Sequence, residues 1–134
     1  ETDKYRNGYI ERFRTLAKSV IACQQPEGYW TRSMLDPEHA PGPETSGTAF
    51  FAYGLFWGIN NGFLDKKTYE PAAKKAWNYL ANVALQPDGK VGYVQPIGEK
   101  AIPGQIVDAN STANFGVGAF LLAACEYVRF LSGK

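Results

Sequence analysis

Two stretches of the chain alternate apolar and polar positions at the spacing of an amphipathic helix. In residues 4–23, Ile10, Phe13 and Ala17 recur every three or four positions, with charged residues between them. Residues 68–84 repeat the pattern, with Pro71 expected in the first turn, where a missing N–H is tolerated. Each of these predicted helices would meet water on one face only.

Two further stretches, residues 45–60 and 111–131, are predicted helices of a different kind, because neither has a charged face over most of its length. Thr45 or Ser46 would cap the earlier one, and Gly62 would end it in a left-handed conformation. A helix that is apolar all round must be covered on all sides. The order along the chain is therefore amphipathic, apolar, amphipathic, apolar.

An internal repeat links the two halves of the chain. Gln25-Pro26-Glu27-Gly28 recurs 61 residues later as Gln86-Pro87-Asp88-Gly89, each time in the loop between an amphipathic and an apolar helix. Repeated helix pairs indicate a solenoid or a closed ring, and outer amphipathic helices with inner apolar ones are typical of an α/α toroid. We predict an all-α fold of two tandem helical hairpins, residues 4–62 and 65–131. An acid before Gly suits a tight turn, so Glu27 and Asp88 are interpreted as turn residues.

Two outer helices cannot cover two inner helices that lack a polar face. Either further hairpins of a larger ring lie outside this chain, or copies associate through the exposed flanks. We prefer the fragment of a larger ring and expect the isolated chain to self-associate. The start at Glu1, without Met and directly before a helical pattern, is consistent with a processed or truncated beginning.

Composition excludes several classes of partner. The 134 residues are 45% hydrophobic with interspersed charges that sum to +1, so the chain is one globular domain without the basic stripe of a nucleic-acid binder. We expect no membrane contact, because a bilayer takes about 20 apolar residues and no apolar run is expected to reach that length. Cys23 and Cys125 are interpreted as buried free thiols. They leave a periplasmic, secreted or cytoplasmic bacterial location open.

No metal or other cofactor is predicted, because His39 is the only histidine and no phosphate-binding glycine loop follows a strand. Glycoside hydrolysis needs a carboxylic acid, but the number of acids in the loops is ordinary for a solvated surface, and none is assigned as catalytic. These acids are Glu27, Asp36, Glu38, Glu44, Asp88, Glu99 and Asp108.

The substrate-binding candidates are Trp30, Arg32 and Glu44. A Trp face stacks on a sugar ring and Arg pairs with a carboxylate, so Trp30 with Arg32 would suit a uronate. The alternative for Trp30 is a packing role against Gln24 or Gln25, weighed evenly. Glu44 precedes a predicted helix, where the helix dipole favours a carboxylate, and a capping role is preferred for it over chemistry.

Three stretches together resemble the unsaturated glucuronyl and rhamnogalacturonyl hydrolases, over the C-terminal third of those enzymes. They are Gly28-Tyr29-Trp30 with the Asp36 region, residues 44–53 (Glu-Thr-Ser-Gly-Thr-Ala-Phe-Phe-Ala-Tyr), and residues 116–123 (Gly-Val-Gly-Ala-Phe-Leu-Leu-Ala) before Glu126. The resemblance implies a six-hairpin (α/α)6 toroid of which this chain forms the last two hairpins.

The resemblance also implies an activity, the removal of a terminal 4,5-unsaturated uronic acid from acidic oligosaccharides derived from pectin or glycosaminoglycans. In that family an Asp acts as general acid and base, without a metal, and hydrates the enol-ether double bond. No residue here matches that Asp, so the chain alone is expected to be inactive. Trp30 and Arg32 fall where the family's loop approaches the sugar cleft.

Two rival interpretations remain open at this point. One is a non-catalytic domain whose helices only complete or oligomerise a ring. The other is a terpenoid-cyclase-like α/α barrel, because Gln24 and Gln25 followed by Gly28-Tyr29-Trp30 resemble the Gln–Trp ties of that group. The cyclase interpretation ranks last because it requires an Asp-rich motif that the sequence lacks.

Overall fold

The computed structural model describes residues 3–133, and all regular elements in this range are helices. The long helices are α1 (Asp3–Ala22), α2 (Thr45–Asn60), α3 (Lys66–Tyr79) and α4 (Asn114–Ser132). A short 3-10 turn, η1 (Pro37–His39), lies in the first long loop, and a π-helical turn, η2 (Leu80–Ala84), extends α3. The all-α prediction is confirmed.

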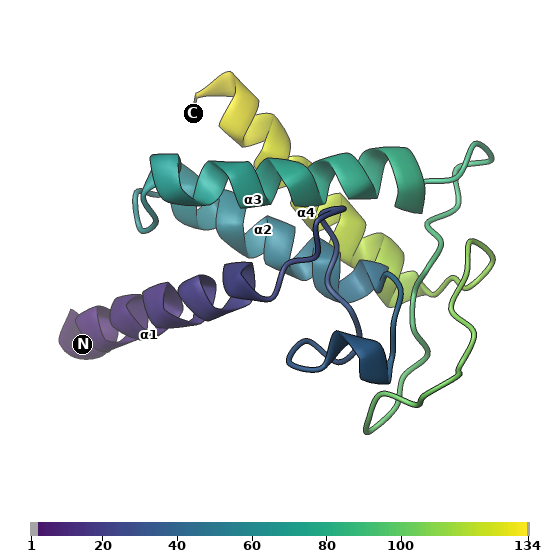
Figure 1. The fold of residues 1–134 in the computed structure, drawn as a ribbon. Coiled ribbons are helices and arrows are strands. Elements are labelled where there is room, and N and C mark those ends of the chain that lie inside the picture. The colour runs from purple at the N-terminus through teal and green to yellow at the C-terminus, as the bar shows by residue number, and fades with distance from the viewer. Residues whose placement is uncertain (1–2, 134) are drawn as a thin grey trace.

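Helix α2 lies at the centre of the molecule and packs along α4 and α3 (Figure 1). Helix α1 extends away from this group and contacts α2 mainly through its C-terminal half, where Ala17 and Val20 are buried. The core between α2, α3 and α4 contains Phe56, Tyr79 and Leu80, all fully buried. Both inner helices begin on the side where the two long loops gather.

The ends of the helices differ from the sequence-based prediction in two places. Glu44, rather than Thr45 or Ser46, caps α2, because its longer carboxylate reaches the backbone N–H groups of the first turn. Pro71 lies inside α3 rather than in its first turn, because Asp65 caps that helix earlier than expected. The predicted end of α2 is confirmed, since Gly62 adopts a positive φ of 71°.

The two Gln-Pro-acid-Gly segments form the same turn. In the first, the Gln25 N–H donates to the Tyr29 carbonyl (2.9 Å) and the Gly28 N–H to the Gln25 carbonyl (2.9 Å). The second repeats both bonds at Gln86, Gly89 and Lys90, with lengths of 2.7 and 2.9 Å. Both glycines have positive φ, 104° and 87°. The internal duplication is confirmed, and so is the interpretation of Glu27 and Asp88 as turn residues.

Large apolar side chains remain exposed on the inner helices, α2 and α4. This was predicted, because two outer helices cannot cover two inner helices that lack a polar face. On α4 they are Val117, Leu121, Leu122, Val128 and Leu131, and α2 adds Phe50. By length and composition alone α4 could cross a membrane, which corrects the view that no apolar run in the sequence is long enough. Core helices of soluble proteins share this property, and α4 packs along α2 in this structure.

Candidate functional site

The two long loops are hydrogen-bonded to each other at the start of α2. The Thr45 N–H donates to the Tyr93 carbonyl (2.9 Å), and the Gln95 N–H donates to a carboxylate oxygen of Glu44 (3.2 Å). On the other side, the Glu44 N–H donates to the Trp30 carbonyl (3.1 Å). Residues from both copies of the repeat therefore meet at one end of the inner helices.

Glu44 is the centre of this junction and is only 3% exposed. Its Oε1 accepts from the Ser46 N–H (3.0 Å) and hydroxyl (2.7 Å) as well as from Gln95, and its Oε2 accepts from the Gly47 N–H (2.6 Å). Both oxygens are committed to the helix cap and to the neighbouring loop. The structure thus gives Glu44 the capping role and leaves no exposed oxygen for a ligand.

Trp30 is also a structural residue, with only 1% of its surface exposed. Its indole N–H donates to the Val20 carbonyl (2.8 Å), its backbone N–H donates to the Thr48 hydroxyl (3.0 Å), and its ring meets Phe51 edge to face. No ring face is exposed to a sugar in this structure, which favours the packing interpretation of Trp30. Gln24, which was considered as its packing partner, instead ties the Gly28 carbonyl to α3.

Arg32 is the one sequence-predicted site residue that faces a pocket. Its Nη1 donates to the side-chain oxygen of Gln105 (3.0 Å) and its Nη2 to the Gln105 carbonyl (3.1 Å), across the gap between the two loops. The pocket beside it has a volume of about 240 Å³. Its lining comprises Arg32, residues 95–102 and Gln105.

The lining of this pocket includes an acid, Glu99, as well as the Arg32 guanidinium. Among residues 3–133, no carboxylate lies within ion-pair distance of the Arg32 guanidinium, and its buried Nε has no hydrogen-bond partner. His39 is exposed, with its Nε2 3.4 Å from the Ala101 carbonyl. The described part of the chain has no cluster of metal-binding side chains.

The cysteines differ from their sequence-based interpretation in burial. Both are free thiols, as expected. Cys23 is only partly buried and Cys125 is exposed, so the prediction that both are buried is wrong. Cys125 lies on α4, a helix on which large apolar side chains also remain exposed.

Two tyrosines near the junction were missed by sequence reasoning. Tyr93 has a φ of 58°, the only left-handed non-glycine among the described residues, and it is held there by bonds from Thr45 and to Asp108. Tyr79 shares a 2.8 Å hydrogen bond with the Thr45 hydroxyl. Burial raises the pKa of Tyr79 well above its usual value, so it remains protonated and acts as a packing residue.

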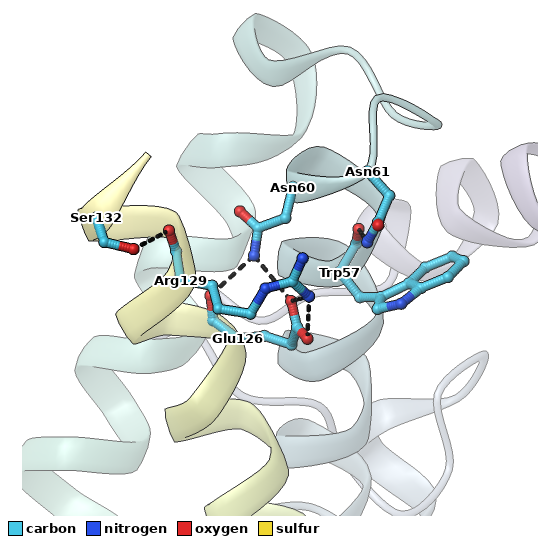
Figure 2. Close-up of polar contacts among 6 residues, drawn as sticks. All are labelled: Trp57, Asn60, Asn61, Glu126, Arg129 and Ser132. Carbon is cyan, nitrogen blue, oxygen red and sulfur yellow. Dashed lines mark hydrogen bonds and ion pairs between the residues drawn. The ribbon is translucent and has the colours of Figure 1, made fainter. Parts of the chain in front are cut away.

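A second polar cluster lies at the opposite ends of the inner helices (Figure 2). Glu126, 7% exposed, accepts two bonds from the Arg129 guanidinium (2.7 and 3.0 Å) and one from the Asn60 amide (2.8 Å). Asn60 also donates to the Glu126 carbonyl (2.9 Å). This cluster joins α2 to α4, and because its carboxylate is fully paired we interpret it as structural.

The two tandem helical hairpins, with their long loops gathered at one end, have the architecture of an α/α toroid. The model of glycosyl hydrolase family 88 matches residues 1–131. The chain belongs to this family, which confirms the resemblance seen in the sequence and decides against the cyclase interpretation.

A curated relative, the unsaturated 3S-rhamnoglycuronyl hydrolase of Formosa agariphila, is 43% identical over 126 residues. The alignment covers 94% of this chain but 32% of that protein. The chain therefore spans about a third of the length of the curated relatives it matches.

Two solved structures are similar in both sequence and fold. One, described as a polysaccharide lyase, is 81% identical with a TM-score of 0.92, covering 98% of this chain and 37% of that one. The other, a glycosyl hydrolase family 88 protein from Bacteroides vulgatus, is 72% identical with a TM-score of 0.91, covering 95% and 36%. The descriptions of these two similar structures name two different reactions, a lyase and a hydrolase.

Proposed function

We propose that the chain is the C-terminal part of a longer enzyme that removes unsaturated uronic acids from oligosaccharides. The observation that carries this proposal is the 43% identity, over nearly the whole chain, to a relative named for an unsaturated rhamnoglycuronyl substrate. The pocket beside Arg32 supports it, because a guanidinium with no carboxylate partner suits an acidic sugar.

The proposed reaction is hydration of the enol-ether double bond of the terminal uronate. A proton adds to one carbon of the double bond and water adds to the other, giving a hemiketal that releases the remaining sugar. This requires a carboxyl group free to exchange a proton. The two buried acids of the described residues are engaged, Glu44 by the cap of α2 and Glu126 by Arg129, and we propose that the catalytic acid belongs to another part of the enzyme.

The role proposed for this chain is to supply part of the rim of the substrate cleft. Of the three candidates, Arg32 carries this role, since Trp30 and Glu44 are buried and fully bonded. The other proposed partner is the rest of the toroid, which would cover the apolar faces of α1, α2 and α4. Without the rest of the toroid, those apolar faces would drive self-association of the isolated chain. The rival interpretation, a non-catalytic domain that oligomerises, predicts the same association.

The sign of an ultraviolet absorbance change tests the reaction. The full-length enzyme should lower the absorbance of an unsaturated uronyl-rhamnose disaccharide, because hydration destroys the conjugated double bond. A lyase, the reaction named for the 81% identical structure, would instead raise the absorbance of an intact uronic-acid polysaccharide. The isolated 134-residue chain should do neither, and a fall in absorbance with this chain alone would contradict the absence of the acid.

A further inference from the structure

The pairing of Arg32 with an uncharged partner defines a more specific site within the proposed cleft. Arg32 comes from the first loop and Gln105 from the second, 73 residues apart in the sequence. Gln105 fixes both terminal nitrogens of the guanidinium, one with its side-chain oxygen and one with its backbone carbonyl. An amide holds the guanidinium in place as a carboxylate would, but it leaves the positive charge uncompensated.

Two N–H groups of the Arg32 guanidinium have no partner among residues 3–133. A guanidinium has five N–H groups, of which Gln105 takes two and the Ile102 carbonyl, at 3.4 Å from Nη1, takes one weakly. The N–H on Nε has no partner and is shielded from water. A buried donor without an acceptor is unfavourable, and the adjacent Nη2 has a second N–H. Together Nε and Nη2 form an edge that matches two oxygens of one anionic group, and such a group would displace the neighbouring atoms that shield Nε.

The surroundings agree with this interpretation. The pocket that Arg32 lines is built largely from the backbone of the second loop, with Gln95, Glu99 and Lys100 as its other long polar side chains. Neither Glu99 nor any other carboxylate of residues 3–133 lies within 4 Å of the guanidinium. The charge of Arg32 is therefore neutralised by no ion pair within the described part of the chain.

We propose that Arg32, positioned by Gln105, binds a carboxylate or sulfate group of the oligosaccharide, and that the neutral amide of Gln105 is a determinant of specificity for acidic substrates. This rests on the proposed function and deepens it. Gln105 is a positioning residue: it acts through Arg32, and its essential property is that it carries no charge.

Binding titrations with the full-length enzyme test this proposal. The ligands are saturated glucuronyl-rhamnose disaccharides, which lack the double bond and so cannot be hydrated, in three forms: sulfated on rhamnose, unsulfated, and sulfated with the uronate methylated as an ester. Gln105→Glu keeps both tethers to Arg32 but adds a carboxylate that neutralises it. We expect this variant to weaken binding of the sulfated acid about tenfold, the loss of one charge-assisted hydrogen bond.

The other two ligands identify the anionic group. If Arg32 binds sulfate, the unsulfated disaccharide should bind equally well to wild type and Gln105→Glu. If Arg32 binds the uronate, the methyl ester should bind equally well to wild type and Gln105→Glu. The matched control Gln105→Ala removes the side-chain tether but keeps the backbone carbonyl that holds Nη2, adds no charge, and should change binding less than threefold. Lys100→Gln removes a positive charge from the same pocket and should likewise have a small effect.

Equal losses in Gln105→Glu and Gln105→Ala would overturn the proposal, because Gln105 would then act only by holding the loop. Equal losses in Gln105→Glu and Lys100→Gln would also overturn it, by assigning recognition to the general potential of the pocket. These outcomes are independent of the reaction. An enzyme that leaves the unsaturated disaccharide unchanged would refute the proposed function, while the binding titrations would still decide the role of Gln105.

Discussion

The two repeat turns provide a matched pair of glycine substitutions. Gly28 and Gly89 occupy the same position in the same hydrogen-bonded turn, and both have a positive φ. Placing Ala there costs about 1–2 kcal/mol in either turn, because a Cβ is disfavoured in a left-handed conformation. The surroundings of the two glycines differ. A Cβ on Gly28 would overlap the backbone carbonyl of Lys75 on α3, whereas a Cβ on Gly89 would meet nothing within 4 Å.

This difference sets the expected free energies of unfolding. A backbone oxygen inside a packed helix cannot move aside cheaply, so the overlap adds about 1–3 kcal/mol to the cost of Gly28→Ala. We expect that variant to lose about 4 kcal/mol and Gly89→Ala to lose about 1.5 kcal/mol. For a chain of this size a difference of that order corresponds to roughly 8 °C in melting temperature.

Urea and thermal unfolding of the two variants, at one protein concentration, measure this difference. Equal destabilisation would refute the reasoning, because turn conformation alone would then account for both effects. A harmless Gly28→Ala would show that the close approach of the first turn to α3 does not exist in solution. Gly54→Ala on α2, where a Cβ meets nothing and φ is negative, is the control for an added methyl group.

Three further outcomes follow from the same contacts. Glu44→Ala should cost about 2–4 kcal/mol in urea unfolding by leaving buried donors unpaired, whereas Ala at the exposed Glu38 should cost almost nothing. Trp30→Phe, which loses the bond to Val20, should lower stability by about 1–3 kcal/mol while kcat/KM of the folded full-length enzyme is unchanged; a reduced kcat/KM would restore a substrate role. Hydrogen bonds from Thr68 lower the pKa of Asp65, so its stabilising effect is present above its usual pKa of 3.8 and is lost as pH falls through the lower folded value. Melting temperatures of Asp65→Asn should therefore fall less than those of wild type below about pH 4.

The fold was predictable from the sequence because it depends on periodic patterns. Helix positions, the duplication and the exposed inner faces all follow from apolar spacing and from the repeated Gln-Pro-acid-Gly turn. The ends of the helices were harder, because capping depends on which side chain reaches the free N–H groups. Glu44 lies one position before the expected cap at Thr45 and makes the bonds itself, and no pattern of apolar residues records that geometry.

The site was less predictable because it depends on contacts between distant residues. Trp30 has the same sequence signature whether its ring stacks on a sugar or fills a core, and only its 1% exposure and its bond to Val20 decide between them. The partnership of Arg32 with Gln105 crosses 73 residues and leaves no local signal. Glu126 and Arg129, in contrast, are three residues apart on one helix, and that spacing alone could have indicated their ion pair.

The repeat also separates structural positions from functional ones. With the offset of 61 residues, Trp30 corresponds to Val91. Both residues are buried and form short backbone bridges, so the two copies differ here only in the size of a buried side chain. Arg32 corresponds to Tyr93, and here the copies differ in chemistry: one residue is a cation that lines the pocket, the other a strained tyrosine that anchors α2. A duplicated fold can differ in chemistry between its copies at loop positions that lie outside the core. Arg32 occupies such a position, and because its partner comes from the second hairpin, the proposed anion site exists only when both hairpins are folded together.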